Sequence, residues 1–415
     1  MKDPTGLDEA MAAAVESIGR ADILVGIPSF RNAATIGHVA RTVSEGLRRS
    51  FPDAKTVVVN ADGGSTDGTR DRLRAALDGT PAVVGEYVGL PGKGSAFRAI
   101  FEVAGRVGAR ACAVVDSDLR SITPEWVERL LRPVLEGEAD YVAPLYARHK
   151  HDGTITNTIA YPLTRALYGR RVRQPIGGEF GFSGGLANEF LAGGALSGEG
   201  GDVWGSDVAR FGIDIYMTTT ALTRGARVAQ AFLGAKIHDP KDPGADLGPM
   251  FRQVVGTAFR LAAASRERWA AVDGSSDVPV VGDVREVEPE EIRVDAALLA
   301  SRFREGAADS GKIWDEALSP EASAAVRRAL DEHVPRSLAG ETWATIVYDA
   351  LAASAERPAW TDAYVLSLVP LYFGRVAAFV SDAASLSTAA AERLVEEQAA
   401  AFESRKPYLR ERMAR

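Results

Sequence analysis

The sequence has few of the features that mark secreted or nucleic-acid-binding proteins. It has a single cysteine, Cys112, among 415 residues, which excludes an internal disulfide and a thiolate-rich metal site. This cysteine lies in an apolar run, where it is expected to be a small buried side chain in a reducing compartment. The net charge is −8, so the chain has no overall basic footprint for nucleic acid.

Long apolar runs are also missing. No stretch approaches the roughly 20 uninterrupted apolar residues of a transmembrane helix. Residues 1–20 carry acids where a signal peptide would be basic and then apolar. We therefore expect a cytoplasmic protein without a membrane span. With 46% apolar and 25% charged residues, the composition is that of a globular protein, and the length allows two or more domains.

Strand and helix patterns alternate from residue 22 to about residue 145. Stretches with apolar residues at helical spacing separate short apolar runs that are rich in β-branched residues. The predicted strands are 23–27, 56–60, 82–84, 113–115 and 141–145. This alternation predicts an α/β domain with a mainly parallel, Rossmann-like sheet.

The pattern changes after residue 146. The expected elements are a helix at 157–168, a glycine-rich loop at 193–201, a helix near 211–222, a strand at 228–232 and a proline-containing loop at 239–249. Helices dominate from there on, apart from a linker at 273–283. We expect a first domain over residues 1–275 and a C-terminal helical domain over 276–415. Apolar stripes in the helical domain indicate packing within the chain or a subunit contact.

Two carboxylates one residue apart, Asp116 and Asp118, follow a predicted buried strand. Ligands of open α/β sheets bind at the carboxyl ends of the strands, and carboxylate oxygens suit Mg²⁺ or Mn²⁺. A pair of acids at a strand end is also found in loops that cap a helix. The motif alone leaves both interpretations open.

Other polar residues stand at comparable points. Asp62 ends the second strand, where a carboxylate accepts hydrogen bonds from a base or ribose hydroxyl, or else caps the following helix together with Ser65. Lys93 lies between glycines at a helix start, where an anion would meet the ammonium group and the helix dipole; a solvated turn lysine is the alternative. The phosphate loop of nucleotide hydrolases is excluded, because Tyr87 stands where that motif needs glycine.

Two later residues extend this set. His238 follows a strand, and a neutral imidazole there could complete a metal shell begun by Asp118; a surface histidine is the alternative. Asp214 follows a glycine and opens a helix, either as a pocket carboxylate or as an ordinary acid of a first helical turn.

Taken in order, these motifs resemble the GT-A glycosyltransferases, and most closely the retaining glucosyl-3-phosphoglycerate, mannosylglycerate and glucosylglycerate synthases. The resemblance covers residues 22–255. It implies nucleotide-sugar binding over about 22–145 and an acceptor side over about 146–255. The segments that carry it are Ile27–Asn32, Asp62–Asp67, Gly92–Gly94, Asp116–Asp118, Gln174–Glu179, Gly212–Asp214 and His238.

The resemblance implies a role for each matched position. Asp118 and His238 would bind Mg²⁺ or Mn²⁺, and Asp214 would be the catalytic residue near the acceptor. Asp116 would meet the ribose, whereas Gly178 and Glu179 would line the sugar pocket. The full donor-binding set would be Pro28, Ser29, Asp62, Lys93, Asp116, Ser117, Gly178 and Glu179.

The acceptor side departs from the family pattern. Phosphoglycerate synthases carry a Gly-Arg-Val-Thr segment, and here Gly153–Thr156 occupies this region without the arginine. Arg148, Lys150 and His151 supply positive charge nearby, and with Thr154 and Asp214 they are the predicted acceptor-binding residues. The resemblance implies transfer of a hexose from UDP-glucose or GDP-mannose to glycerate or 3-phosphoglycerate, with retention of the anomeric configuration.

Two other functions stay open. An inverting GT-A transferase acting on a polyprenyl phosphate or a polysaccharide shares the N-terminal motifs, but usually brings a membrane segment or a docking helix. A non-catalytic sugar-nucleotide binder, with the helical tail as the interface of a homodimer or larger homo-oligomer, would bind a donor without turnover.

Overall fold

A computed structural model describes residues 5–193, 203–237, 243–285, 287 and 289–414, without the side chains of 203–205 and 243–247. The chain divides into two compact units. Unit 1 comprises residues 1–147, 176–241 and 278–288, and unit 2 comprises residues 148–175, 242–277 and 289–415. Each unit is made of three separate segments of the chain. The predicted boundary after residue 275 divides the chain only once, into two continuous domains.

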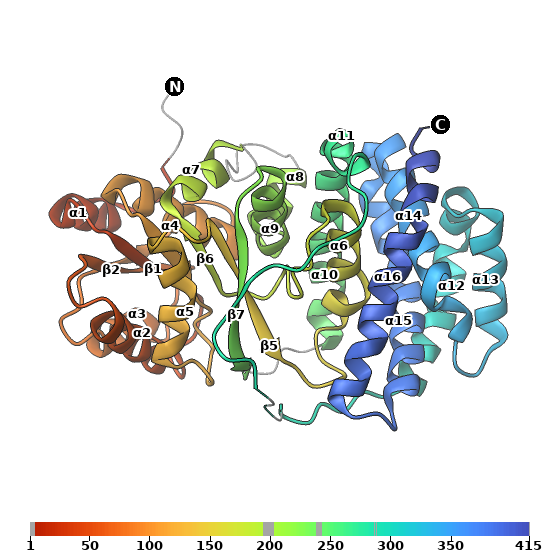
Figure 1. The fold of residues 1–415 in the computed structure, drawn as a ribbon, viewed down its shortest axis with the longest axis horizontal. Helices are drawn as coiled ribbons and strands as arrows, with labels where there is room; N and C mark the ends of the chain where they lie inside the picture. Colours follow the sequence, from red (N-terminus) through yellow and green to blue (C-terminus); the bar gives the residue numbers. More distant parts are fainter. Residues whose placement is uncertain (1–4, 194–202, 238–242, 286, 288, 415) are drawn as a thin grey trace. The chain divides into compact units, whose positions relative to one another are not determined.

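Unit 1 is built on a sheet, several of whose strands are labelled in Figure 1. Its described strands run in the order β3-β2-β1-β4-β6-β5-β7-β8. The strands are β1 (Ile23–Ser29), β2 (Thr56–Asp62), β3 (Ala82–Glu86), β4 (Ala111–Val114), β5 (Tyr141–Ala147), β6 (Phe180–Ser183), β7 (Val228–Ala235) and β8 (Val280–Val281). Neighbouring strands are parallel except where β6 pairs with β4 and β5. The predicted α/β fold with a mainly parallel sheet and a C-terminal helical region is confirmed.

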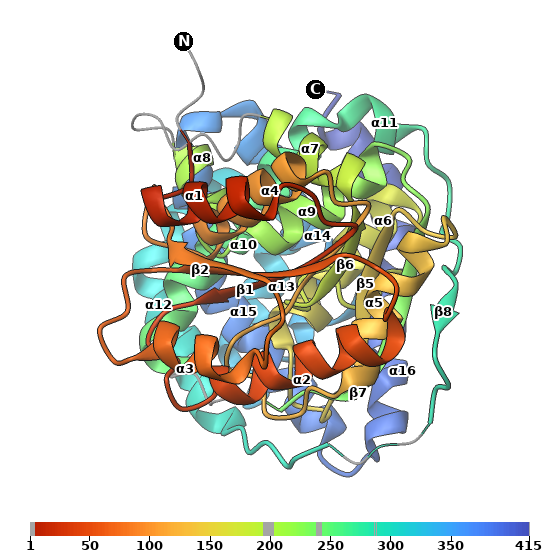
Figure 2. The same cartoon turned by 90° about the vertical axis from the view of Figure 1, so that its left-hand side faces the viewer.

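Helices cover both faces of this sheet. Figure 2 shows α1 and α4 above strands β1 and β2, and α2 and α3 below them. The helices of unit 1 are α1 (Glu9–Ile18), α2 (Ile36–Ser50), α3 (Thr69–Ala76), α4 (Lys93–Val107), α5 (Pro124–Leu135), α7 (Gly184–Ala192), α8 (Val203–Val208) and α9 (Ile213–Thr223).

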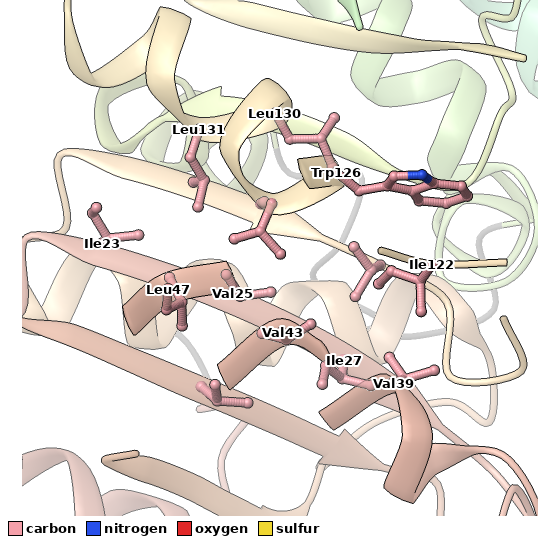
Figure 3. Close-up of a cluster of buried hydrophobic side chains, with 14 of the residues drawn as sticks. Ile23, Val25, Ile27, Val39, Val43, Leu47, Ile122, Trp126, Leu130 and Leu131 are labelled. Atoms are coloured by element: carbon pink, nitrogen blue, oxygen red, sulfur yellow. The ribbon is translucent and has the colours of Figure 1, made fainter. Parts of the chain in front are cut away.

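The core between the sheet and α2 follows from two side-chain periods. Alternate residues of β1 point to one face, and α2 presents residues four apart to the same space. The side chains that meet there include Ile23, Val25, Ile27, Val39, Val43 and Leu47 (Figure 3). All of them are at most 1% exposed. This packing anchors β1, and with it the start of the loop that follows Ser29.

Strand β6 was missed from the sequence, where the glycines around it argued against a regular element. Gly181 lies in its interior, and a Cβ there would collide with the backbone carbonyl of Leu130 in α5. The glycine therefore marks a close helix–strand approach within a strand. Val114 of β4 pairs with Phe180 of β6, so the residues after β4 and those before β6 emerge at the same edge.

The loop predicted at 239–249 is wrong from residue 243 onward. Helix α10 runs from Pro243 to Ala264, with Pro249 inside it. Proline is compatible with the first helical turn because its missing N–H would have no partner there. Residues 239–242 lie outside the described residues, as does the predicted glycine-rich loop at 193–201 apart from Gly193.

Unit 2 is helical. Its elements are the π-helix η1 (Thr156–Ala160), α6 (Tyr161–Tyr168), α10 (Pro243–Ala264), α11 (Arg266–Ala270), α12 (Ala296–Ala317), α13 (Pro320–Asp331), the 3₁₀ turns η2 (Arg336–Leu338) and η3 (Pro358–Trp360), α14 (Gly340–Glu356), α15 (Thr361–Ala383) and α16 (Thr388–Arg412). The apolar stripes of α14 and α15 are mostly buried within the unit.

Polar side chains attach the segment 148–175 to the C-terminal helices of unit 2. The Arg165 side chain is 6% exposed and forms ion pairs with Glu396 at 2.6 Å and Glu403 at 2.9 Å. The indole N–H of Trp343 donates to the carbonyl of Thr158 at 2.7 Å. These contacts explain why a segment from the middle of the chain belongs with its last helices.

One stretch, Pro358–Ala383, is long and apolar enough to cross a membrane by length and composition. Its most apolar window is 78% buried inside the structure. A core helix of a globular protein passes the same test, so this stretch is weak evidence for a span.

Candidate functional site

Five charged side chains of unit 1 form one continuous chain of ion pairs. Lys93 at the start of α4 binds Asp116 at 2.9 Å and Asp214 of α9 at 3.2 Å. Asp116, two residues after β4, also binds Lys236 at 3.0 Å. Lys236 in turn binds Glu179, directly before β6, at 2.9 Å. The chain of alternating sign brings together four residues that the sequence predicted for the site and one, Lys236, that it did not.

Burial shifts the pKa values of these groups. Glu179 is fully buried, and burial raises its pKa to about 7, against the opposing effect of Lys236. Burial likewise raises the pKa of Asp214, although Lys93 partly offsets this. Burial acts to lower the pKa of Lys93, but the charges of Asp116, Asp214 and Glu179 outweigh it and raise that pKa. Lys93 therefore stays protonated.

Both oxygens of Asp116 are occupied in this arrangement, Oδ1 by Lys93 and Oδ2 by Lys236. A cation that needed Asp116 would have to displace a lysine from a site in which both partners are mostly shielded from water. Asp116 is therefore held by two lysines, and the assignment of Asp118 to the metal stays a prediction.

Asp118 lies in a tight turn that is tied down on both sides. Ser117 donates its hydroxyl to Asn32 Oδ1 at 2.8 Å, and the N–H of Arg120 donates to the carbonyl of Ile237 at 2.9 Å. His238, the other predicted metal ligand, lies outside the described residues, but it directly follows Ile237. Among the residues that the structure describes, no group of three or more His, Cys, Asp or Glu side chains is arranged for a metal ion.

The turn before α4 holds Lys93 in place. The N–H of Gly92 donates to the Tyr87 hydroxyl at 2.9 Å, and the N–H groups of Gly94 and Ser95 donate to carbonyls of residues 210 and 209. Gly94 is required here, because a Cβ would collide with the carbonyl of Val208. Because the N–H groups of Gly94 and Ser95 already donate to protein carbonyls, they are not available to an anion. An anion near Lys93 would therefore contact its ammonium group.

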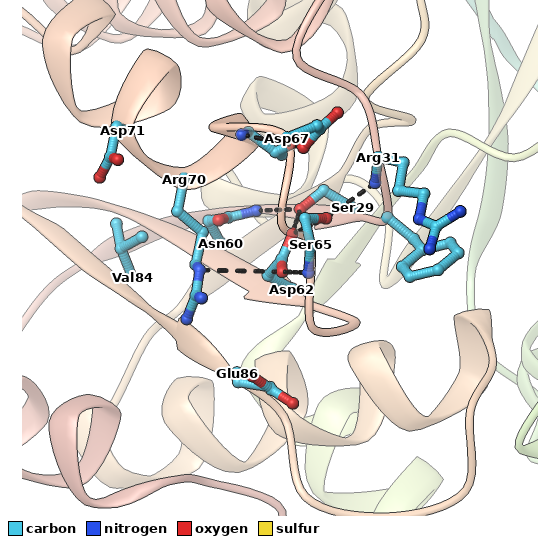
Figure 4. Close-up of polar contacts among 12 residues, drawn as sticks. Ser29, Arg31, Asn60, Asp62, Ser65, Asp67, Arg70, Asp71, Val84 and Glu86 are labelled. Carbon is cyan, nitrogen blue, oxygen red and sulfur yellow. Dashed lines mark hydrogen bonds and ion pairs between the residues drawn. The ribbon is translucent and has the colours of Figure 1, made fainter.

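Asp62 is fully buried inside a hydrogen-bonded loop (Figure 4). It accepts the Ser29 hydroxyl at 2.6 Å and both the N–H and the hydroxyl of Ser65, at 2.6 and 2.8 Å. The capping interpretation is wrong, because α3 begins at Thr69 with Gly68 as its N-cap and without a side-chain cap hydrogen bond. The bonds between Asp62 and Ser65 close the turn after β2 instead. Pro28 and Ser29 are the last residues of β1 and are buried next to it.

The residues just after β1 stand out as exposed and strained. Phe30 is 56% exposed, which is high for an aromatic residue beside a strand end. Arg31 has a φ of +56°, an uncommon conformation for a non-glycine residue. Its guanidinium lies 5.1 Å from the centre of the Phe30 ring. The exposed Phe30 ring thus lies under the Arg31 guanidinium and next to Gly63 of the Asp62 loop.

The predicted acceptor residues Arg148, Lys150, His151 and Thr154 all belong to unit 2. Lys150 donates to the carbonyls of Ala384 and Leu386, both at 2.9 Å. His151 Nδ1 lies 3.1 Å from the carbonyl of Ile292, and Thr154 bonds to the Tyr372 hydroxyl. Their role toward an acceptor stays a prediction.

Sequence reasoning missed Lys236 and Tyr146, whose hydroxyl bonds to Glu179. Lys236 directly follows β7, a strand parallel to β5. A lysine at the carboxyl end of a parallel strand, two residues before His238, was a signal that could have been used. Tyr146 lies near the end of a strand in an apolar run, where nothing local distinguishes it from a core residue.

Part of the chain is similar to a known protein family. Residues 24–187 match the model of glycosyl transferase family 2. This segment contains β1 to β6 and three members of the ion-pair chain, Lys93, Asp116 and Glu179. This match confirms two predictions from the sequence: the resemblance to GT-A glycosyltransferases, and that the protein is a glycosyltransferase. No curated protein sequence matches the chain.

Solved structures of glucosyl-3-phosphoglycerate synthase from Mycobacterium tuberculosis are also similar to the chain. The complex with Mn²⁺, UDP and glucosyl-3-phosphoglycerate is 25% identical, with a TM-score of 0.46, over 63% of this chain and 86% of that one. The complex with Mg²⁺ and UDP is 24% identical, with a TM-score of 0.45, over 62% and 85%. The complex with phosphoglyceric acid is 26% identical, with a TM-score of 0.46, over 62% and 85%.

Proposed function

We propose that this protein is a metal-dependent, retaining glycosyltransferase that moves a hexose from a nucleoside diphosphate sugar to a small anionic hydroxy acid. The observation that carries the proposal is the buried ion-pair chain through Lys93, Asp116 and Glu179 in the part of the chain that matches a glycosyltransferase family. Buried charges of this kind are costly and gather at functional sites.

The donor nucleotide would bind across the carboxyl ends of β1, β2 and β4, as ligands do in open α/β sheets. Asp116, two residues after β4, is the carboxylate that the motif resemblance assigns to the ribose. The exposed ring of Phe30 offers the base a surface for stacking beside the Asp62 loop. UDP or GDP is the nucleotide that the motif resemblance implies.

Mg²⁺ or Mn²⁺ would be held by Asp118 and His238. The residues present suit such an ion, because carboxylate and imidazole are common ligands of Mn²⁺ and carboxylate is the usual protein ligand of Mg²⁺. When bound, the ion neutralises the charge that builds up on the leaving diphosphate. The fixed turn around Asp118 would hold that carboxylate in one place before the donor arrives.

The chain's own residues would orient the sugar and the acceptor. Gly178 and Glu179 lie directly against Asp116, and the motif resemblance assigns them to the sugar pocket. Asp214 lies on the other side of Lys93 and would meet the acceptor. In the reaction the bond from the anomeric carbon to the diphosphate breaks, a bond to the acceptor oxygen forms, and the acceptor's hydroxyl proton passes to the released diphosphate or to solvent. Positioning of this kind accounts for much of the acceleration in group transfer.

The acceptor proposed is glycerate or 3-phosphoglycerate, on the resemblance of the motifs and the positive charge of Arg148 and Lys150. We place the reaction in the cytoplasm, in keeping with a single buried cysteine.

A donor and acceptor screen tests the proposal. UDP-glucose and GDP-mannose are each incubated with Mn²⁺ or Mg²⁺ and either D-glycerate or 3-phosphoglycerate, and the product is analysed by mass spectrometry and NMR. We expect one donor to be consumed with an acceptor and a divalent ion, giving a product of retained configuration. A product of inverted configuration would favour the inverting class. Donor binding without turnover across all acceptors would contradict the proposal.

A further inference from the structure

Lys236 has a buried side chain with four polar contacts, and the proposed function gives it no role. Its side chain is 7% exposed. The ammonium group donates to Asp116 at 3.0 Å, to the carbonyl of Gly177 at 2.9 Å, and to both carboxylate oxygens of Glu179 at 3.0 and 2.9 Å. One side chain from the end of β7 therefore joins the residue after β4 to the loop before β6.

Without this lysine the two acids would destabilise one another. Because Val114 pairs with Phe180, Asp116 and Glu179 emerge at the same edge of neighbouring strands, and the N–H of Asp116 reaches Glu179 Oε1 at 3.4 Å. Two shielded carboxylates this close repel each other unless a cation stands between them. Lys236 is the cation that contacts both.

The loop backbone is shaped around this ion pair. Gly178 has a φ of +100°, and a Cβ at this position would lie 2.6 Å from Asp116 Oδ2 and 2.8 Å from the Lys236 ammonium. The backbone of residues 177–179 thus lies directly against the Lys236–Asp116 pair. A shift of the ammonium group would move the loop with it.

We propose that Lys236 is the positioning residue of the sugar pocket: it fixes the Gly177–Glu179 loop against Asp116, so that the part of the site that holds the donor sugar is formed before the donor binds. This inference rests on the proposed function. It differs from a purely stabilising ion pair, which would affect binding of the nucleotide and of the nucleotide sugar alike.

The test compares UDP with UDP-glucose. Calorimetry in the presence of Mn²⁺ measures both dissociation constants for the wild type, Lys236→Met and Lys236→Arg, and UDP release measures kcat and KM. We expect Lys236→Met to lose at least about tenfold more affinity for UDP-glucose than for UDP, and to lose about 100-fold in kcat. Lys236→Arg, which keeps the charge and the donors, should recover at least about a tenth of kcat.

The outcomes separate the two proposals. If the wild type binds neither UDP nor UDP-glucose, the proposed function fails. If the wild type binds both and Lys236→Met weakens both equally, or neither, the inference about Lys236 is overturned while the function stands. Should Lys236→Met fail to fold, Gly178→Ala carries the test, because it displaces the ammonium group from Asp116 without removing a charge. A Gly178→Ala variant with unchanged discrimination between UDP and UDP-glucose would then overturn it.

Discussion

Replacing Gly178 with alanine should break the ion-pair chain at its centre without removing a charged group. The backbone there has a φ of +100°, which costs an L residue about 1–2 kcal/mol. The added Cβ would lie 2.6 Å from Asp116 Oδ2, whereas ordinary contact begins at 3.4 Å. The Lys236 ammonium group would lie only 2.8 Å from the same Cβ, so both partners of the 3.0 Å bond must move and its present geometry is lost.

The size of the effect follows from the bond that is lost. A hydrogen bond to a charged group contributes about 1.5–3 kcal/mol. If the proposed transfer needs this arrangement, kcat/KM should fall by about 10- to 100-fold, at about 1.4 kcal/mol for each factor of ten. The backbone strain adds a loss of folding stability of its own, which a thermal melt would show as a lower Tm.

Gly137→Ala is the matched control. Gly137 has a φ of +76°, and no heavy atom outside its own chain neighbours lies within 4 Å of the position that a Cβ would take, so alanine brings the same kind of strain and no collision. Both variants should lose Tm, but only Gly178→Ala should lose activity, measured as UDP release from UDP-glucose with acceptor and Mn²⁺. Full activity in Gly178→Ala, or an equal loss in both variants, would refute the reasoning.

Three further predictions concern single side chains. Lys93→Met removes the cation between two shielded acids, so it should lower stability by about 3 kcal/mol and transfer by at least about 100-fold, whereas the exposed Lys55→Met should change neither in the same melts and assays. Since the pKa of Glu179 is about 7 in the folded chain, above the ordinary 4.5, the folded state keeps a proton that the unfolded state releases, and stability should fall as pH rises from 4.5 to 7. Melts of Glu179→Gln across this range should lack that slope, and an identical slope would contradict the assignment. Arg165→Met leaves two glutamates of α16 without their partner; because these are 43% and 21% exposed, the cost should be about 2 kcal/mol, seen as faster hydrogen exchange in α6, and unchanged exchange would count against it.

Local sequence patterns predicted much of unit 1, because its strands and helices are specified by short-range periodicity. The run Val57–Val59 reads as a buried strand in any context, and α2 repeats its apolar residues at helical spacing. Strand β6 escaped because Gly181 serves a contact with α5 that only the tertiary structure reveals. Helix α10 escaped in its first turns because proline was taken as a breaker where it can begin a helix.

The division into units could not be predicted for a different reason. Arg165 binds Glu396 across more than half the chain, and no local pattern signals a contact at that separation. The candidate site shows the same contrast. Residues in recognisable motifs, such as Lys93 and Asp116, were found from the sequence. The position of Lys236 after a strand was a usable signal, but its contacts with Asp116 and Glu179 depend on the order of the strands in the sheet.

The most direct test of the account is the Mn²⁺ dependence of UDP binding in the wild type and in Asp118→Ala, measured by calorimetry. If the carboxyl edge of the unit 1 sheet is a metal-assisted donor site, Mn²⁺ should tighten UDP binding in the wild type by about tenfold or more. Asp118→Ala should melt at the same temperature and lose this tightening. Equal Mn²⁺ dependence in the two proteins, or no UDP binding by the wild type, would contradict it.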